Sequence, residues 1–144
     1  MIKKRDERFF KVAQAIAETS DFISEVNRPI RMGAVIVVKN NILAVGKNSR
    51  KTHPIQKSYN VANAPHKTGN AYLHAEMDAI RKLPRWFAES NFQARLYVSR
   101  YDMNGNFAMS RPCSSCLAAI KDVGISEIYY TTPDGFTFEK LFLD

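Results

Sequence analysis

The feature that most restricts the fold is an uninterrupted apolar run of β-branched character, Gly33–Val38. Such a run, bounded by turn residues, is typical of a buried strand. Asn40 and Asn41 follow it as a turn signal, and residues 42–45 return as a second apolar segment. The sequence therefore predicts a β-hairpin with a buried first strand.

Apolar residues at helical spacing precede this hairpin. They predict a first helix over about residues 5–26, with Ile23 and Val26 continuing its apolar stripe and Pro29 separating it from the strand. The residues that define the stripe are Phe9, Val12, Ala13, Ile16 and Ala17.

Residues 47–70 show no periodicity and are rich in Lys, Asn, Ser, Thr, His, Pro and Gly. We expect a long loop there, and a loop of that length in a compact domain is usually functional. The remaining elements follow in order along the chain. They are a helix over 71–82 with Leu73, Met77 and Ile80 inward, a strand at 96–98, a turn or small hairpin at 102–108, a helix over 113–123 closed by Gly124, a strand at 127–131, a turn at 133–135 and a short strand over 136–142.

This order of elements predicts an α/β fold, a three-layer α/β/α sandwich with a mixed, roughly five-stranded sheet. The length of 144 residues suits a single domain over residues 1–144, and no internal repeat or linker divides it. No apolar run approaches the 18–20 residues that cross a bilayer, and the charged N-terminus does not resemble a secretory signal, so a cytoplasmic protein without a membrane partner is expected. The net charge of +7 favours anionic partners, including nucleotides and nucleic acid.

The chain has two cysteines, Cys113 and Cys116, which lie too close in sequence to make a useful disulfide loop. They begin a predicted helix, where the positive end of the helix dipole lowers thiol pKa values and favours the metal-binding thiolate. His74 begins another predicted helix and supplies an imidazole. Three ligands of the Cys₂His type leave one tetrahedral position open, the pattern of a catalytic zinc site.

Glu76 lies two residues after His74, too near for both to bind one metal from the same helix face. Its carboxylate suits the transfer of a proton from water activated by the zinc to a ring nitrogen and then to departing ammonia. Other interpretations are a redox pair of cysteines, or a structural zinc site completed by His53 or His66. A redox pair does not need the His-x-Glu segment, and a structural site has no use for Glu76.

The segments His-Ala-Glu (74–76) and Pro-Cys-x-x-Cys (112–116) resemble the zinc signature of the cytidine and deoxycytidylate deaminase superfamily. The likeness extends over most of the chain, through residues 33–37, the Gly-x-Asn at 46–48, the helix at 74–80 and the strand that ends at Tyr130. It implies Zn²⁺ held by three residues of these segments, with Glu76 as the proton shuttle. The implied ligands are His74, Cys113 and Cys116.

The resemblance also implies substrate contacts. The backbone of Ala75 would contact the base, Asn48 would hydrogen bond the sugar or base, and Tyr130 or Tyr129 would pack against the substrate. Neighbouring strand residues face opposite sides, so one of the two tyrosines must face the core.

Basic residues offer contacts to a phosphate. Arg28 and Arg31 precede the first strand, and further cations lie in the long loop, at Lys47, Arg50, Lys51 and Lys57. For each of them a solvated basic surface is an equally good interpretation. Trp86 and Phe87 mark either a packing cluster at a helix end or a stacking platform for nucleic acid.

Three departures from the family pattern stand out. About ten residues, 101–110, separate the strand from the Pro-Cys pair, as a lid or rim. Arg111 stands where transfer-RNA adenosine deaminases have Glu. Residues 132–144 are too few for a further helix and a parallel strand. They predict a fifth strand antiparallel to the fourth, as in nucleoside-type and polynucleotide-toxin deaminases.

The leading hypothesis is a deaminase that converts cytosine to uracil in a free cytidine nucleotide such as dCMP. The alternative is a polynucleotide cytosine deaminase, which the charge, the basic loop and the aromatic residues favour. A third is a non-catalytic module stabilised by zinc. The family resemblance further predicts a homo-oligomer.

Overall fold

A computed structural model describes residues 2–20, 23–25, 28–64, 72–102 and 104–141. A mixed sheet forms the centre, with strands in the order β3, β2, β6, β7 and β8, and a short strand β1 pairs with the beginning of β2. Only β6 and β7 run parallel among these pairs. The strands are β1 (Ile23–Glu25), β2 (Arg28–Val38), β3 (Asn41–Lys47), β6 (Ala94–Tyr101), β7 (Ile125–Thr132) and β8 (Gly135–Lys140).

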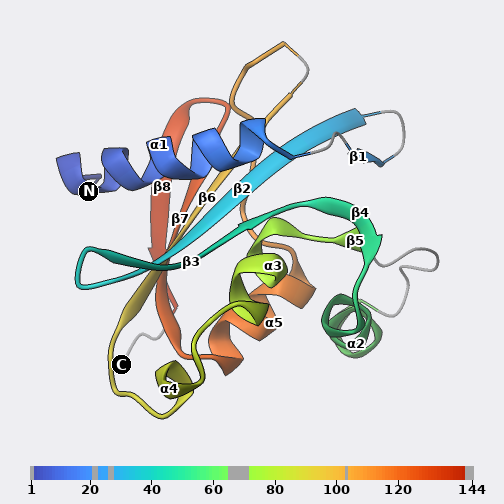
Figure 1. Cartoon of the computed structure of the whole chain (residues 1–144). Coiled ribbons are helices and arrows are strands. Elements are labelled where there is room, and N and C mark those ends of the chain that lie inside the picture. The colour runs from blue at the N-terminus through green and yellow to red at the C-terminus, as the bar shows by residue number, and fades with distance from the viewer. Residues whose placement is uncertain (1, 21–22, 26–27, 65–71, 103, 142–144) are drawn as a thin grey trace.

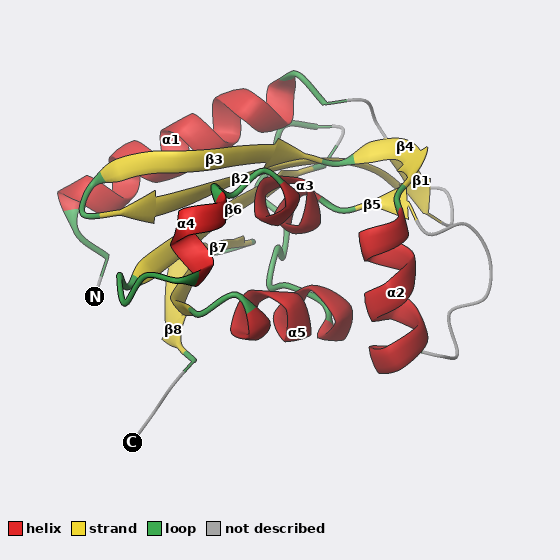
Figure 2. Cartoon of the chain, turned by 60° about the horizontal axis from the view of Figure 1, so that its bottom comes forward, coloured by secondary structure: helices red, strands yellow, loops and turns green. Residues whose placement is uncertain are grey.

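Helices cover both faces of this sheet (Figure 1). Helix α1 (Lys4–Glu18) lies on one face. The other face carries α3 (Ala75–Arg81) and α5 (Ser114–Asp122), with α4 (Arg85–Ala88) and α2 (Pro54–Asn63) beside them (Figure 2). A two-stranded ribbon of β4 (Ser49–Thr52) and β5 (Tyr72–Leu73) extends the same side. The predicted three-layer α/β/α architecture is confirmed.

Strand β2 is buried on both faces, as the apolar run predicts. Val35 and Val37 pack beneath α1, together with aromatic residues of β6 and β7. Ala34 and Ile36 face the opposite way, into the cluster formed with α3 and α5. Alternation along the strand therefore divides the core into two layers, one on each side of the sheet.

Two glycines allow helices to approach the sheet very closely. A Cβ atom on Gly33 would lie 2.0 Å from the carbonyl oxygen of Ala13 in α1, and one on Gly46 would lie 2.2 Å from the carbonyl oxygen of Ala75 in α3. Both contacts are with backbone, which cannot move aside as a flexible side chain can. The absence of a side chain at Gly46 thus sets the distance between β3 and the beginning of α3.

The first helix is shorter than the predicted 5–26. It ends at Glu18, where the hydroxyl groups of Thr19 and Ser20 donate to carbonyl oxygens in the last turn. Such local side-chain bonds compete with helical ones and favour termination. Ile23 lies in β1, and Val26 falls outside the described residues. Pro29 is part of β2 and does not separate it from the helix.

The prediction of a structureless loop over 47–70 is also wrong in part. Residues 49–52 form β4 and residues 54–63 form α2, while 65–70 lie outside the described residues. Helix α2 fully buries only one side chain, the polar Gln56, while its apolar residues Ile55 and Tyr59 are partly buried against the core. The helix therefore gives only a weak apolar periodicity. Its start is marked instead by Pro54 in the first turn and by His53, whose Nδ1 accepts from the Ile55 amide.

Most of the remaining predicted elements are present, with shifted ends. The predicted helix over 71–82 divides into β5 and α3, which begins only at Ala75. An antiparallel bridge between Tyr101 and Phe107 closes the small hairpin predicted at 102–108, within which residue 103 lies outside the described residues. The last strand, β8, pairs antiparallel with β7 as predicted. No described helix is long and apolar enough to cross a membrane.

We expect the substitution Gly46→Ala to lower the free energy of unfolding by about 1–3 kcal/mol or more, because its methyl group would overlap the backbone of α3. Urea denaturation measures this change. Gly105→Asn is the control, since Gly105 has a left-handed φ of 79° in an open turn, which asparagine tolerates. Equal stabilities of Gly46→Ala and the native chain would contradict the close-packing account.

Candidate metal centre

Two helices begin at the same place and bring three metal-binding side chains together. His74 is the residue before α3, Cys113 is the residue before α5, and Cys116 lies in the first turn of α5. Nδ1 of His74 lies 3.6 Å from Sγ of Cys113 and 3.3 Å from Sγ of Cys116. All three ligand atoms lie within 4.8 Å of one another.

These distances fit a tetrahedral zinc ion. Bond lengths of about 2.3 Å for Zn–S and 2.0–2.1 Å for Zn–N place neighbouring N and S ligands roughly 3.5 Å apart. Among the described residues this is the one group of at least three His, Cys, Asp or Glu side chains so arranged. His53 is not part of it, and His66 lies outside the described residues. Within the described part of the chain, this donor set leaves the fourth position open.

The two thiols share their protons unequally. Hydrogen bonding from Cys116, together with the neighbouring His74, lowers the pKa of Cys113 to about 3. The same bond, together with burial, raises the pKa of Cys116. A cation bound between the two sulfur atoms would favour the thiolate form of both.

Glu76 lies in the first turn of α3 and is only 1% exposed. Burial is the largest influence on its carboxyl group and raises its pKa. The group also interacts with His74, Cys113 and Cys116, yet its Oε1 has no hydrogen-bond partner among the described residues. A buried carboxyl oxygen without a partner is costly, and beside a metal-ligand cluster it is explained by a ligand that it contacts when bound.

Helix α2 supports His74 through a residue that sequence reasoning missed. Oε1 of Gln56, a fully buried side chain, accepts from the backbone amide of His74 at 3.1 Å. Its Nε2 donates to Asn60 at 2.9 Å, which fixes the orientation of the amide. Tyr59 joins α2 to α5 by donating to Asp122 at 2.8 Å. The sequence signal that could have located this support is Pro54 at the start of a helix.

Asp78 fixes α3 to the end of β3. Its carboxylate accepts from the backbone amide of Lys47 at 3.0 Å and forms ion pairs with Arg81 and Lys82. Hydrogen bonds from Lys47 and Lys82 lower the pKa of this largely buried carboxyl group, against the opposing effect of burial. The beginning of α3 is thus held by Asp78 as well as by the close approach at Gly46.

The predicted substrate-binding residues lie in different surroundings. Ala75 is fully buried at the start of α3. Asn48 is buried two residues beyond Gly46, and its Oδ1 accepts from the Met32 amide at 2.9 Å. Both therefore lie near the N-terminus of α3. Their contact with substrate stays a prediction.

Tyr130 and Arg31 differ in the face that they occupy. Tyr130 belongs to the core cluster on the α3 and α5 side, and its hydroxyl donates to Glu139 at 2.6 Å. Tyr129 packs on the α1 side, so the expected division between the two tyrosines is found. Arg31 alternates with Met32, which packs on the α3 and α5 side, and therefore faces the α1 side. The contact of Arg31 with substrate stays a prediction.

The aromatic pair after Pro84 also divides. Phe87 is buried in the core, and Trp86 is 49% exposed and packs edge-on against Phe92. Arg111 forms a two-pronged ion pair with Glu139 on β8, so it is tied to the last strand.

The sequence matches the family described as "Cytidine and deoxycytidylate deaminase zinc-binding region" over residues 3–132. No curated protein matches it. Among solved structures, the dCMP deaminase of cyanophage S-TIM5 is similar, with 22% identity over 92% of this chain and 86% of that one and a TM-score of 0.56.

Two cytidine deaminases have a similar fold. That of Burkholderia pseudomallei has 16% identity, covers 96% of this chain and 93% of its own, and has a TM-score of 0.56. That of Mycobacterium leprae has 21% identity, covers 92% and 91%, and has a TM-score of 0.51. With the family match over most of its length and a Cys₂His cluster of zinc-binding geometry, the chain belongs to the cytidine and deoxycytidylate deaminase family and is a zinc-dependent hydrolytic deaminase.

Proposed function

We propose that this protein deaminates the cytosine base of a free cytidine nucleotide such as dCMP, with zinc held by His74, Cys113 and Cys116. The observation that carries the proposal is the buried carboxyl group of Glu76, whose Oε1 has no partner among the described residues and which interacts with the three ligands. A site that only stabilised the fold would have no use for this carboxyl group.

The reaction consumes water and releases ammonia, and its protons need a carrier. Zinc supplies a Lewis acid that brings the pKa of water towards about 7. Glu76 would accept one proton from the attacking water and deliver it to the ring nitrogen next to the amino-bearing carbon. It would then take the remaining proton from the added hydroxyl group and deliver it to the amino group, so that ammonia leaves and a carbonyl group forms. Burial raises the pKa of Glu76 above its usual value, which favours uptake of a proton by its carboxylate.

Several observations bear on the choice of substrate. The similarity to a phage enzyme described as a dCMP deaminase supports dCMP, with Asn48 and the Ala75 backbone as the proposed contacts to the sugar and base. The antiparallel β8 favours instead the nucleoside-type or polynucleotide-type enzymes, as does the exposed Trp86 for a polynucleotide. The homo-oligomer also stays a prediction. Sedimentation velocity measures the oligomeric state and tests it.

We expect Glu76→Gln to reduce kcat for cytosine deamination at least about 100-fold while zinc content stays near one ion per chain. The amide fills the same volume but cannot carry the proton. Activity is measured by uracil formation and zinc by atomic absorption. The control, Glu89→Gln, changes an exposed carboxylate after α4 and should keep native activity. Native turnover by zinc-loaded Glu76→Gln would refute the role of Glu76.

We expect Gln56→Leu to weaken zinc binding by about 10–100-fold, because the His74 amide loses its acceptor and the side chain loses its orientation. Competition with a chromogenic chelator measures the affinity. Gln14→Leu, on the opposite face of the sheet, is the matched control and should leave it unchanged. Native zinc affinity in a folded Gln56→Leu protein would show that α2 does not position the ligand.

Substrate assays distinguish the proposed activities. The zinc-loaded protein is given dCMP, cytidine and a cytosine-containing single-stranded oligonucleotide, and we expect the highest kcat/KM with dCMP. A preference for the oligonucleotide, with steep salt dependence, would replace the proposal by the polynucleotide reaction. If none of the three substrates yields uracil, the remaining hypothesis is a non-catalytic module stabilised by zinc.

A further inference from the structure

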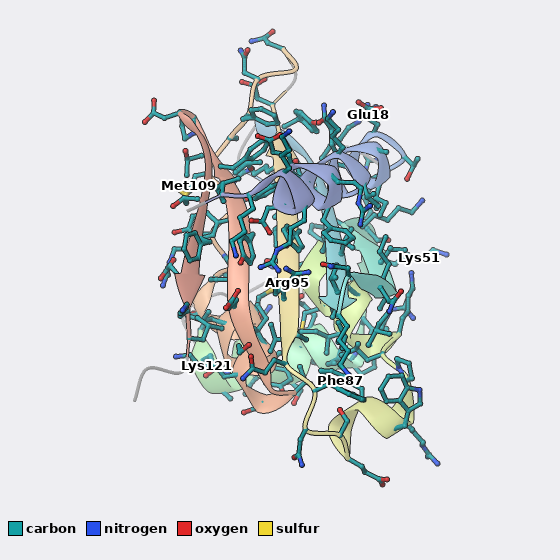
Figure 3. The ribbon with its side chains drawn as sticks, turned by 90° about the vertical axis from the view of Figure 1, so that its left-hand side faces the viewer. Glu18, Lys51, Phe87, Arg95, Met109 and Lys121 are labelled. Atoms are coloured by element: carbon teal, nitrogen blue, oxygen red, sulfur yellow. The ribbon has the colours of Figure 1, made fainter. Side chains whose placement is uncertain are left out.

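A pocket separate from the metal centre lies beneath the first turn of α1. It has a volume of about 230 Å³. Four parts of the chain contribute to it, namely the start of α1, the β2–β3 turn, the start of β6 and the start of β7. Its lining residues are Arg5, Lys39, Asn40, Gln93, Arg95, Ser126 and Glu127. Arg95 extends from β6 on this side of the molecule (Figure 3).

Three of the lining side chains are cationic and one is anionic. Nε of Arg5 is buried and has no hydrogen-bond partner among the described residues; it lies 3.5 Å from Asp6, which is long for a hydrogen bond. Arg95 uses one nitrogen to donate to Asn40 at 2.8 Å, and its guanidinium group has further donors. Glu127 accepts from the Tyr129 hydroxyl at 2.7 Å. Arg95 also lies over the rings of Phe9 and Tyr97, and Asp6 forms an ion pair with Arg5. With three cations and one carboxylate the lining is positively charged, and the buried Nε of Arg5 is a donor available to a ligand.

This pocket cannot be part of the metal centre. Arg95 precedes Leu96, which faces α3 and α5, so it lies on the α1 face of the sheet. Arg95 and Glu127 pair at the beginning of the parallel strands β6 and β7. Cys113 lies at the other end of α5, which runs back over nine residues, about 13 Å, to the start of β7. The two sites occupy opposite faces and opposite ends of the sheet.

We propose that this pocket binds the phosphate groups of a phosphate-bearing ligand. Its volume is below the about 300–1,000 Å³ of pockets that enclose a drug-sized molecule, so it suits one or two phosphate groups with the rest of the ligand outside. Guanidinium groups match phosphate oxygens in pairs, and two of the three cations are arginines.

The rim of the pocket offers a surface for the remainder of such a ligand. Lys39, which lines the pocket, places its Nζ 4.5 Å from the ring centre of Phe92. Phe92 precedes the lining residue Gln93 and is 44% exposed. An exposed aromatic ring beside a phosphate pocket favours a ligand that also carries a flat ring, either a free nucleotide or the backbone of a nucleic acid.

Binding of inorganic pyrophosphate to the zinc-loaded protein tests the site. We expect saturable binding by calorimetry, weakened about tenfold or more in Arg95→Gln and in Lys39→Gln, and tightened in Glu127→Gln. Lys11→Gln, which removes an exposed cation of α1 outside the pocket lining, is the matched control. This variant should bind pyrophosphate as the native chain does. Lys39 is exposed in a turn, so its variant serves even where Arg95→Gln does not fold.

Amide resonances locate the ligand independently of affinity. We expect pyrophosphate to shift the signals of Asn40, Gln93 and Ser126 and to leave those of Cys116 unchanged. Absence of saturable binding, an equal loss in Lys11→Gln, or shifts confined to the metal centre would overturn the proposal. None of these outcomes depends on deaminase activity, so failure of this site and failure of the proposed function are distinguishable.

Displacement of pyrophosphate identifies the source of the phosphate. Displacement by a deoxynucleoside triphosphate would support a free nucleotide, and displacement by single-stranded oligothymidylate, with steep salt dependence, would support a nucleic-acid backbone. Displacement by neither would overturn the assignment to a phosphate-bearing biological ligand.

Discussion

Two helix N-termini must meet at one point for this metal centre to exist, and that requirement governs the structure around it. A zinc ion tolerates only a few tenths of an ångström of variation in its ligand distances. His74 and Cys116 come from separate helices, so the positions of α3 and α5 must both be fixed. Helix α5 connects the parallel strands β6 and β7 and is thereby held against the sheet. Helix α3 is held by the backbone contact at Gly46 and by Asp78.

The sequence predicted the metal-binding residues of the site, but not the contacts that hold those residues in place. The apolar run at 33–38 and the two short metal-binding segments carry strong local signals, since each requires particular residue types at fixed spacing. Gln56 carries no such signal. Its contribution depends on a contact with the His74 amide eighteen positions away, made by a helix that fully buries no other side chain. Neither propensity nor periodicity reports a contact between distant polar groups.

The same reasoning applies to Arg31, whose contact with substrate stays a prediction. Its position just before the apolar run is compatible with either face of the sheet, and only the register of β2 decides between them. Once Met32 and Ala34 pack on the α3 and α5 side, Arg31 is directed to the other side. Pro29 was misleading for a related reason. It suggested an interruption, yet it lies near the beginning of β2 in a segment paired with the short edge strand β1.

The direction of the last strand has a consequence for the metal centre. Because β8 returns antiparallel along β7, it brings Glu139 within reach of both Tyr130 and Arg111. Arg111 stands two residues before Cys113, so this contact restrains the segment that enters α5. The ion pair is partly exposed and contributes about 0–1 kcal/mol at most to stability. The Arg111–Glu139 pair matters because it fixes where the segment before α5 lies. If β8 ran parallel to β7, a different residue would stand beside the start of α5.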